Sequence, residues 1–567
     1  TFNSRLIATL LVCGGAAFNA SAASYYNVSA PMMQLQGTLY LSQDENPCTP
    51  GASWTLKTGG LYQMATCMGS VEASPENLKT LLSEQWVNSS TGSTELTLAT
   101  NIDLGEISET EGECNANHEP LPFPGQGTFN GNGFTISNLC YVSETMSQPV
   151  GFFESAKSGL ISGFSLDGVR ILIKGTSTDG ADYYPVGSVI GVLDSASVSG
   201  ATVSNVSIDA PIAGGVAGLV VNSTLSKVEV FKNVLVKNSH KIETGYAGSQ
   251  SKVLNAPYSV FLGGIAGVSI RDNGTKDYTL VDNQVTATVW NNAQGISSAV
   301  GGAVGYVASS LDHFKNVKVT SGTLKDNGSS LIYGGSAMGG LFGYVSLSYL
   351  NGSPVTSDTS VTRVEGCSFN GVLGMASSPD VFAVGGLIGR DSLWARSRLE
   401  IVSSSAEVSI NEQLNTAGTY RYYAGGLLGY GNDCQSSERL EDFIAIEKSK
   451  SVGIISLTAS DKAVEDLHVT TFLGGIAGAA CFAMDGSGFK DDTSSVNIVS
   501  NVRTTGDSLS IGGMVGSMNA AGKAGISLDN LAYTGRISVQ DSLSEVYVGG
   551  IVGQFREAYG GKTINFK

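Results

Sequence analysis

A pattern of apolar residue, Gly, Gly, apolar, apolar, Gly recurs along this chain and organises it. Nine copies lie between residues 213 and 553, and a degenerate copy starts at Gly187. Their first and last glycines are Gly214 and Gly218, Gly263 and Gly267, Gly301 and Gly305, Gly339 and Gly343, Gly385 and Gly389, Gly425 and Gly429, Gly474 and Gly478, Gly512 and Gly516, and Gly549 and Gly553. Because alternate residues of a strand face opposite sides, the pattern predicts a strand with two apolar faces, as in a covered parallel sheet.

Between the glycine motifs, a second type of segment alternates apolar and polar residues. Residues 205–208, 316–319 and 407–410 are examples, and their period of two indicates half-buried strands. Successive first glycines are most often about 38 residues apart, which predicts a repeat of that length with insertions. Each repeat would then hold one glycine-framed strand and one alternating strand, stacked against its neighbours.

These patterns predict an all-β chain, a parallel β-helix or β-solenoid of about ten glycine-rich repeats over residues 149–567. A β-propeller is the alternative, because its blades also repeat every 40 or so residues. The uneven spacing, the strands with two apolar faces and the lack of a Trp-Asp or kelch signature disfavour the propeller.

Residues 24–148 differ from the repeats and are predicted to cap the solenoid. Residues 74–82 begin with Ser74 and Pro75, which suit the start of a short helix. Strands are expected at 95–105 and on both sides of an Asn-Gly turn within 127–139. Residues 1–23 combine Arg5, an apolar run and small residues, which predicts a signal peptide cut near Ala22 or Ala23. No later apolar run is long enough to span a bilayer, so we expect a secreted or cell-surface protein without an integral membrane span.

The glycine motifs resemble those of bacterial surface proteins with GLUG-motif repeats. The match is literal at 340–343, 386–389 and 426–429, and residues 95–105 and 127–139 resemble the segments that precede such arrays. Proteins of this kind include adhesins and the non-catalytic parts of some secreted immunoglobulin-cleaving peptidases. The resemblance implies a β-helix, export and surface display, and it carries over no catalytic residue.

The composition and charge of the chain limit the classes of partner that are expected. The chain has 73 glycines, 14% charged residues and a net charge of −17. Glycine and small β-formers suit short strands and tight turns. A field of this sign repels nucleic acid and anionic bilayers, so nucleic acid is not expected as a partner.

Seven cysteines follow the predicted signal peptide, and none has the spacing of a metal or redox site. In an oxidising compartment, Cys48 with Cys67 and Cys114 with Cys140 are expected to form local disulfides. Cys367, Cys434 and Cys481 then leave at least one thiol unpaired.

Candidate chemistry is sparse, and the chain is not expected to be an enzyme. The four histidines, His118, His240, His313 and His468, fall at unrelated places in the repeat. The acidic doublets Asp491-Asp492 and Glu441-Asp442 are expected to be solvated loop charges. No cofactor is expected. Calcium is an alternative at 272–277 or near Asp103, Glu106, Glu109, Glu111 and Glu113, although Lys276 disfavours the first of these.

We therefore expect an adhesive or structural protein whose insertions, such as 238–259 and 432–450, bind a host cell, a polysaccharide, another surface ligand or copies of itself. The first alternative is a polysaccharide-acting β-helix enzyme, which a groove combining acids with an Arg or Lys would favour. The second is a spacer or assembly subunit, suggested by the last glycine motif, which lies 14 residues before Lys567.

Overall fold

The computed structural model of the chain describes residues 53–56, 68–71 and most of 95–566. Within the last range it leaves out 99, 111, 124–126, 146–147, 175–183, 240–259, 272–276, 294–296, 309–311, 327–335, 347–348, 351–352, 355–360, 376–380, 392–397, 415–417, 432–442, 460–466, 483–485, 503–507, 521–525, 541–544 and 558–563. The predicted signal peptide, the predicted helix at 74–82 and the Cys48–Cys67 pair lie outside the described residues.

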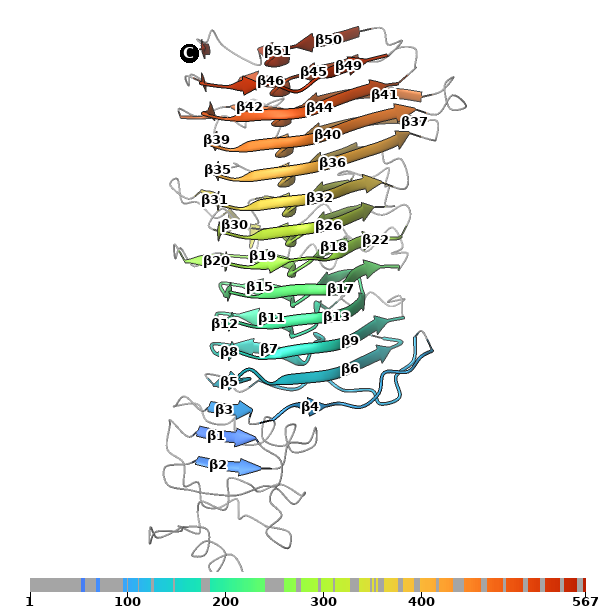
Figure 1. Cartoon of the computed structure of the whole chain (residues 1–567), viewed down its shortest axis with the longest axis vertical. Helices are drawn as coiled ribbons and strands as arrows, with labels where there is room; N and C mark the ends of the chain where they lie inside the picture. Colours follow the sequence, from blue (N-terminus) through green and yellow to red (C-terminus); the bar gives the residue numbers. More distant parts are fainter. Residues whose placement is uncertain are drawn as a thin grey trace, which may run out of the picture.

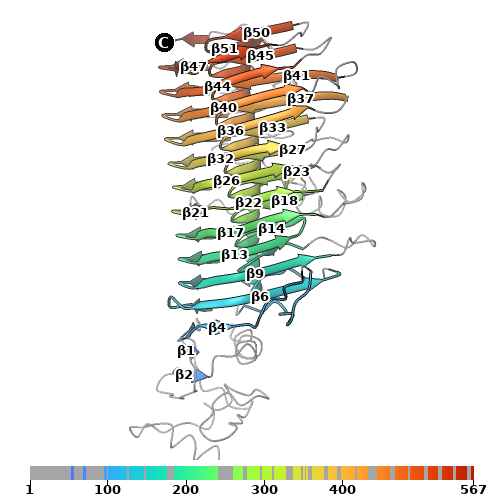
Figure 2. The same ribbon diagram turned by 45° about the vertical axis from the view of Figure 1, so that its right-hand side comes forward.

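Four parallel sheets run along the molecule and form a β-solenoid (Figures 1 and 2). Sheet A holds β1 (Ser53–Leu56), β2 (Met68–Val71), β3 (Glu95–Leu98), β5 (Thr128–Asn130), β8 (Leu160–Ser162), β12 (Ser197–Ser199), β16 (Thr224–Ser226), β20 (Tyr278–Val281), β25 (His313–Lys315), β31 (Thr362–Glu365), β35 (Arg398–Val402), β39 (Phe443–Glu447), β43 (Gly488–Lys490), β47 (Ile526–Asp529) and β52 (Ile564–Phe566). Sheet B holds β4 (Ile102–Asp103), β6 (Thr135–Ser143), β9 (Ser165–Ile173), β13 (Thr202–Asp209), β17 (Glu229–Asn238), β21 (Gln284–Val285), β22 (Thr288–Asn291), β26 (Lys318–Asp326), β32 (Ser368–Met375), β36 (Ser405–Leu414), β40 (Lys450–Ala459), β44 (Thr493–Asn501), β48 (Ala532–Tyr533) and β49 (Ile537–Val539).

Sheet C holds β7 (Phe153–Lys157), β11 (Ile190–Asp194), β15 (Ala217–Val221), β19 (Ala266–Ile270), β24 (Val304–Val307), β28 (Phe342–Val345), β34 (Ile388–Asp391), β38 (Leu428–Gly431), β42 (Ala477–Phe482), β46 (Val515–Ala520) and β51 (Val552–Glu557). Sheet D holds β10 (Val186–Gly187), β14 (Ile212–Gly214), β18 (Val260–Gly263), β23 (Ser298–Gly301), β27 (Ser336–Gly339), β33 (Val381–Gly385), β37 (Gly418–Gly425), β41 (Leu467–Gly474), β45 (Ser508–Gly512) and β50 (Glu545–Gly549). A short antiparallel pair, β29 (Tyr349–Leu350) and β30 (Ser353–Pro354), stands apart. The predicted parallel β-solenoid is confirmed, and the propeller is wrong.

The basic coil is shorter than predicted and has four strands instead of two. The chain visits sheets D, C, A and B in turn, and all four connections are two residues long between β10 and β14. This coil, from Gly187 to Gly214, spans 27 residues. In the later coils the D–C and A–B corners keep two residues, and the long insertions fall at the B–D and C–A corners. Within the described strands only single extra residues occur, at register shifts such as the one in β20. The spacing of about 38 residues is therefore a coil of this basic length with insertions.

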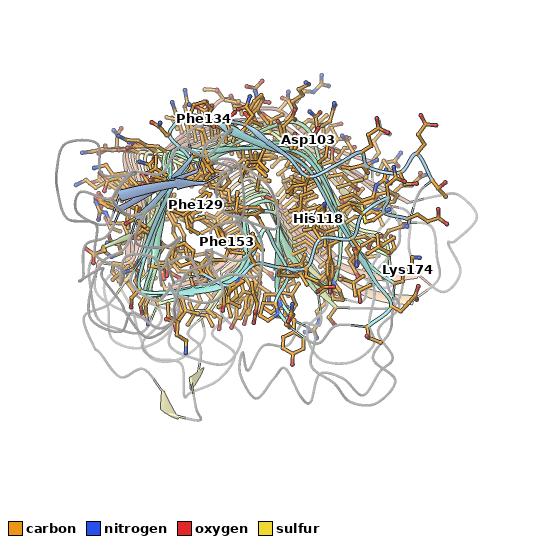
Figure 3. The ribbon with its side chains drawn as sticks, turned by 90° about the horizontal axis from the view of Figure 1, so that it is seen from below. Asp103, His118, Phe129, Phe134, Phe153 and Lys174 are labelled. Carbon is orange, nitrogen blue, oxygen red and sulfur yellow. A yellow bond between two sulfur atoms is a disulfide. The ribbon has the colours of Figure 1, made fainter. Side chains whose placement is uncertain are left out.

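The core has two lobes separated by a wedge that is made of sheets C and D (Figure 3). Sheets A and C enclose one lobe, where the rings of Phe314 and Phe342 lie 4.3 Å apart. Sheet D lines the other lobe together with sheet B. Between the lobes, C and D pack back to back, and the rings of Tyr423 in D and Tyr430 in C lie 4.4 Å apart. Sheets C and D each face a lobe of the core on one side and each other on the opposite side. Their strands are therefore buried on two faces, as predicted.

The glycine motif forms the tip of this wedge, so the predicted single strand is wrong. Each sheet D strand ends at the first glycine of the motif and the next two residues bend. A sheet C strand then begins three residues after that first glycine, as at Gly214 and Ala217. A Cβ on the first glycine would overlap sheet C backbone. At Gly385, for example, it would meet the carbonyl oxygen of Ile388. The absence of side chains is thus what allows the two sheets to approach so closely.

The N-terminal segments extend the sheets instead of forming a separate hairpin. Strand β5 adds to sheet A and β6 to sheet B, so the Asn-Gly turn at 131–134 is an A–B corner and its two strands do not pair with each other. The predicted strand at 95–105 divides in the same way into β3 and β4. A strap, which we define as residues 104–123, then runs along the lower edge, where the His118 N–H donates to the Cys140 carbonyl at 2.9 Å. The cap predicted over residues 24–148 as a whole stays a prediction.

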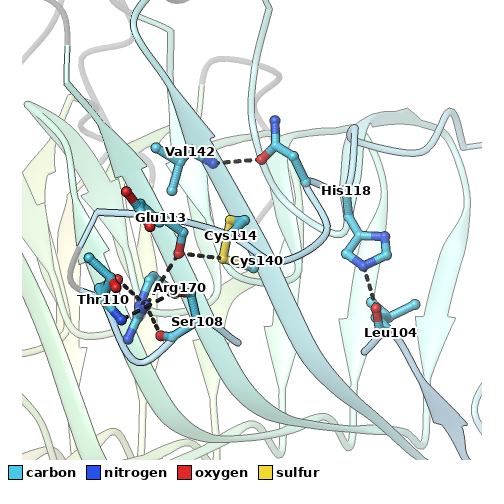
Figure 4. Close-up of a disulfide and its surroundings, with 10 residues drawn as sticks. Leu104, Ser108, Thr110, Glu113, Cys114, His118, Cys140, Val142 and Arg170 are labelled. Atoms are coloured by element: carbon cyan, nitrogen blue, oxygen red, sulfur yellow. Dashed lines mark hydrogen bonds between the residues drawn. A yellow bond between two sulfur atoms is a disulfide. The ribbon is translucent and has the colours of Figure 1, made fainter. Parts of the chain in front are cut away.

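A disulfide between Cys114 and Cys140 fixes the strap to β6 (Figure 4), and this is the pairing expected from their spacing. Arg170 of β9 adds a second attachment, because its Nη1 donates to the carbonyl oxygens of Ser108 at 2.6 Å and Thr110 at 3.2 Å. Cys481 is also disulfide-bonded, and Cys367 is a buried free thiol. Burial raises the pKa of Cys367 to about 12, so the thiol is unreactive at neutral pH.

Polar side chains line the inner side of the A–B corners and form what we call the corner ladder. Its members each accept the backbone N–H at the same corner one coil below: Asn283 from Val228, Cys367 from Val317, Ser404 from Cys367, Ser449 from Ser404, and Asp492 from Ser449. The side chains replace backbone partners that a tight corner does not supply. Asp492 is completely buried, so the expectation that it is a solvated loop charge is wrong. The doublet Glu441-Asp442 lies outside the described residues.

Candidate functional site on sheet A

Charged and aromatic side chains gather along β20, β25, β31 and β35 of sheet A and at the C–A corners that precede them. Four ion pairs connect them: Arg271 with Asp312, Lys315 with Glu365, and Arg363 with both Glu365 and Glu400. The cluster has a buried part inside the corner and an exposed part on the outer face of sheet A.

The buried part is an ion pair with its own hydrogen bonds. Arg271 and Asp312 are 2% and 0% exposed, and the Arg271 Nε lies 3.7 Å from the Asp312 Oδ1. Thr279 donates to that oxygen at 2.5 Å, and Ser269 donates to Oδ2 at 3.3 Å. Burial raises the pKa of Asp312 to about 6, although Thr279 and Arg271 oppose this shift. At neutral pH the carboxylate therefore stays ionised opposite the guanidinium.

This buried pair changes the register of sheet A. Tyr278 lies opposite His313 and Leu280 lies opposite Phe314, so Thr279 is an extra residue between them. Thr279 turns inward and is 2% exposed, because its hydroxyl is bonded to Arg271 and Asp312. A bulge of this kind redirects neighbouring side chains. Tyr278 consequently stands on the outer face.

The exposed part is a column of Tyr278, His313, Arg363 and Glu400, which are paired strand by strand. The Arg363 Nε donates to Glu365 at 3.1 Å and its Nη1 donates to Glu400 at 2.5 Å. Partial burial by itself would lower the pKa of Arg363. The hydrogen bonds and negative charges of Glu365 and Glu400 have the larger combined effect, so the pKa is raised. Burial, followed by the charges of Arg363 and Arg271, lowers the pKa of His313, so its imidazole is neutral at neutral pH.

Next to this column, the outer face of sheet A changes character. In β5, β8, β12 and β16 its side chains are Thr128, Asn130, Leu160, Ser162, Ser197, Ser199, Thr224 and Ser226, none of which is charged. Ser226 donates to Ser199 at 3.0 Å across two coils. Tyr278 thus stands at the border between an uncharged hydroxyl-rich floor and a charged patch.

The predicted candidate residues do not come together here. His313 belongs to the patch, whereas His118 lies in the strap with its Nε2 at 2.5 Å from the Leu104 carbonyl oxygen. His240 and residues 272–276 are not described, and the side chain of His468 is not described either. Asp103, in the acidic run considered for calcium, accepts hydrogen bonds from Asn138 and the Gly105 N–H, which lower its pKa.

Two negative findings apply to the described residues alone. No group of three or more His, Cys, Asp or Glu side chains there is arranged to hold a metal ion. In the same part of the chain, no helix has the length and apolar character needed to cross a membrane.

No protein-family model, no curated protein and no solved structure matches the chain. The resemblance to GLUG-motif surface proteins therefore stays a prediction from the sequence. The site has to be interpreted from its own geometry.

Proposed function

We propose that the chain is a secreted or cell-surface adhesion protein of the GLUG-motif kind, in which a rigid solenoid presents binding loops and catalyses no reaction. The observation that carries this proposal is the position of the insertions within the coils. From β10 onward the D–C and A–B corners keep two residues, whereas the B–D and C–A corners take up the long insertions. Variable loops on a rigid scaffold are where recognition usually resides.

The two variable corners are neighbours in space. Sheets C and D pack back to back and join at the wedge tip, so their other ends, where the B–D and C–A connections start, lie on one side of the solenoid (Figure 3). Both variable corners therefore face the same side of the solenoid, and the charged patch of sheet A borders that side. The insertion predicted at 432–450 is shorter than expected, because β39 occupies its second half.

The charged patch favours binding over hydrolysis of a polysaccharide. A glycosidase pairs a protonated acid with a second carboxylate. Glu365 and Glu400 both accept hydrogen bonds from Arg363, so the same guanidinium occupies both carboxylates. We therefore propose a non-catalytic role for this patch.

Deleting residues 239–259 should leave the solenoid folded and weaken binding to target cells. Lys237 pairs with Asp209 and Phe261 pairs with Ile212, so joining Asn238 directly to Val260 recreates the Ala210-Pro211 corner one coil below. The thermal midpoint should stay equal or rise slightly, because closing a long loop costs entropy. Circular dichroism and a thermal melt measure the fold, and sedimentation with intact cells measures binding.

A variant in which a Gly-Ser segment of equal length replaces 239–259 is the control, since it keeps the spacing and removes only the sequence. Both variants should bind cells less well than the unchanged chain. If the unchanged chain binds no cell type, the adhesive function is wrong and the spacer role gains support. If the deletion unfolds the protein, the equivalence of the two corners is wrong.

A further inference from the structure

We infer that Tyr278 and the hydroxyl floor beside it form a subsite for a sugar ring of a neutral polysaccharide. The inference rests on the proposed adhesive function and names the class of ligand. It depends on three features of the outer face of sheet A: the Tyr278 ring, short hydroxyl side chains on the two strands next to it, and the absence of charged side chains among these.

Tyr278 provides the wall of the subsite. The Lys315 Nζ of the next coil lies 5.5 Å from the centre of its ring, and the His313 ring centre lies at 6.3 Å. These contacts come from the charged side and support one face of the ring. On the opposite side the neighbouring strand presents Thr224 and Ser226, whose side chains are too short to cover the outer part of a tyrosine ring. The face that looks toward the floor can therefore take the apolar face of a sugar.

The floor provides hydrogen-bonding groups in a regular array. Ser197 pairs with Thr224 and Ser199 pairs with Ser226, so four hydroxyls lie on two adjacent strands. Adjacent strands are about 4.8 Å apart and alternate residues of one strand are about 6.6 Å apart. Thr224 already donates to the Tyr278 carbonyl oxygen at 2.8 Å and Ser226 to Ser199 at 3.0 Å, so these two hydroxyls are left to accept hydrogen bonds from a saccharide. The hydroxyls of Ser197 and Ser199 can donate as well as accept.

The charge distribution around the subsite favours a neutral ligand. The floor carries no charged side chain, and the whole chain has a net charge of −17, which repels uronates and sulfated glycans. Two cations of the charged patch, Lys315 and Arg363, are already paired with Glu365 and Glu400. They are thus less available to an anionic ligand.

The buried ion pair acts as a positioning device for this subsite. Thr279 turns inward because its hydroxyl bonds to Asp312 and Arg271, and this bulge is what leaves Tyr278 on the outer face. Thr279 is therefore a positioning residue. Thr279→Val should remove the inward hydrogen bonds and weaken sugar binding, whereas Thr279→Ser should keep both.

The test uses affinity electrophoresis of the full chain in native gels that contain dextran, laminarin, xyloglucan or galactomannan, with polygalacturonate as the charged comparison. At least one neutral polysaccharide should retard the protein, and polygalacturonate should not. Tyr278→Ala should weaken the apparent affinity about tenfold, which corresponds to the loss of one stacking contact. Tyr278→Phe should stay within about twofold, because it keeps the ring. Tyr547→Ala, at another exposed tyrosine, is the matched control and should bind normally.

Each variant is also measured for its thermal midpoint and for sedimentation with cells. If no neutral polysaccharide retards the protein, or if Tyr278→Ala binds as well as the unchanged chain, the subsite is wrong. If cells are still bound in that case, the adhesive function stands without this subsite. If neither cells nor polysaccharides are bound, both proposals fail.

Discussion

Gly385→Ala should destabilise the solenoid strongly, by on the order of 3 kcal/mol or more. Gly385 is the first glycine of its motif, where sheets D and C meet back to back. A Cβ there would overlap the carbonyl oxygen of Ile388 and crowd the backbone nitrogen of Gly429. Both neighbours are backbone atoms of paired strands, so relief requires the two sheets to separate and not merely a side chain to turn.

Gly550→Ala is the control for the same chemical change at an open position, because a Cβ there would meet nothing within 4 Å. It should change the urea midpoint little. Gly550 is the second glycine of the last motif. In the coils below, the second glycine is close-packed too, since a Cβ on Gly386 would meet the carbonyl oxygen of Gly426. Urea unfolding followed by circular dichroism compares the variants through the first transition, because repeat arrays need not unfold in one step. Equal midpoints for both alanine variants would contradict the proposed close contact of the sheets.

The repeated glycines were enough to predict a parallel solenoid with doubly buried strands, but not the bend within the motif. Apolar residues before and after the Gly-Gly pair suit one extended strand as well as two strands around a corner. What decides between them is the packing of sheet C against sheet D, which involves neighbouring coils and leaves no local signal in the motif. The length of the basic coil was also not apparent from the sequence. Among the complete coils that the structure describes, just the one from Gly187 to Gly214 has no insertion.

The candidate site was less accessible to sequence analysis than the fold. Arg271 and Asp312 come from different coils and are separated by 41 positions that include undescribed insertions, so no fixed spacing relates them. Thr279 and Tyr278 look like ordinary members of an alternating strand until the register shift is known. An alignment of the coils on the constant A–B corners would have placed Asp312 next to the start of β20, in the coil that also holds Arg271. That signal becomes visible once the four-strand coil is known.

The burial of Asp492 could not be predicted from the sequence, because Asp491 and Asp492 form the same two-residue corner and look alike. Asp491 has a positive φ of 56° and accepts a hydrogen bond from Asn530 at the surface, as expected of a solvated acid. The next residue points inward and joins the corner ladder, where Asn283, Cys367, Ser404 and Ser449 occupy the same position in other coils. Only the corner geometry separates the two environments.

Asp492→Asn should make the protein less sensitive to alkaline pH. Burial raises the pKa of Asp492 to about 8, and the charges of Glu447 and Asp491 act in the same direction against two backbone hydrogen bonds. In the unfolded chain an aspartate releases its proton near pH 4. Between about pH 4 and pH 8 the folded state therefore binds a proton that the unfolded state has lost. Stability must fall as the pH rises through this range, by about 1.4 kcal/mol per pH unit.

Asparagine keeps one of the two hydrogen bonds that the Asp492 carboxyl group accepts. Its Oδ1 can accept the Ser449 N–H, as the Asn283 Oδ1 accepts the Val228 N–H, whereas its Nδ2 would replace the oxygen that accepts the Lys490 N–H at 3.1 Å. At pH 5 the variant should therefore be no more stable than the unchanged chain. Chemical denaturation at pH 5, 7 and 9 should show a midpoint that falls with pH in the unchanged chain and much less in the variant, so that the variant gains on the order of a few kcal/mol between pH 5 and pH 9. Asp529→Asn, at a partly exposed acid of the same corner region, should leave the pH dependence unchanged. A parallel pH profile for Asp492→Asn and the unchanged chain would mean that Asp492 is ionised in the fold, and that its two backbone hydrogen bonds outweigh its burial.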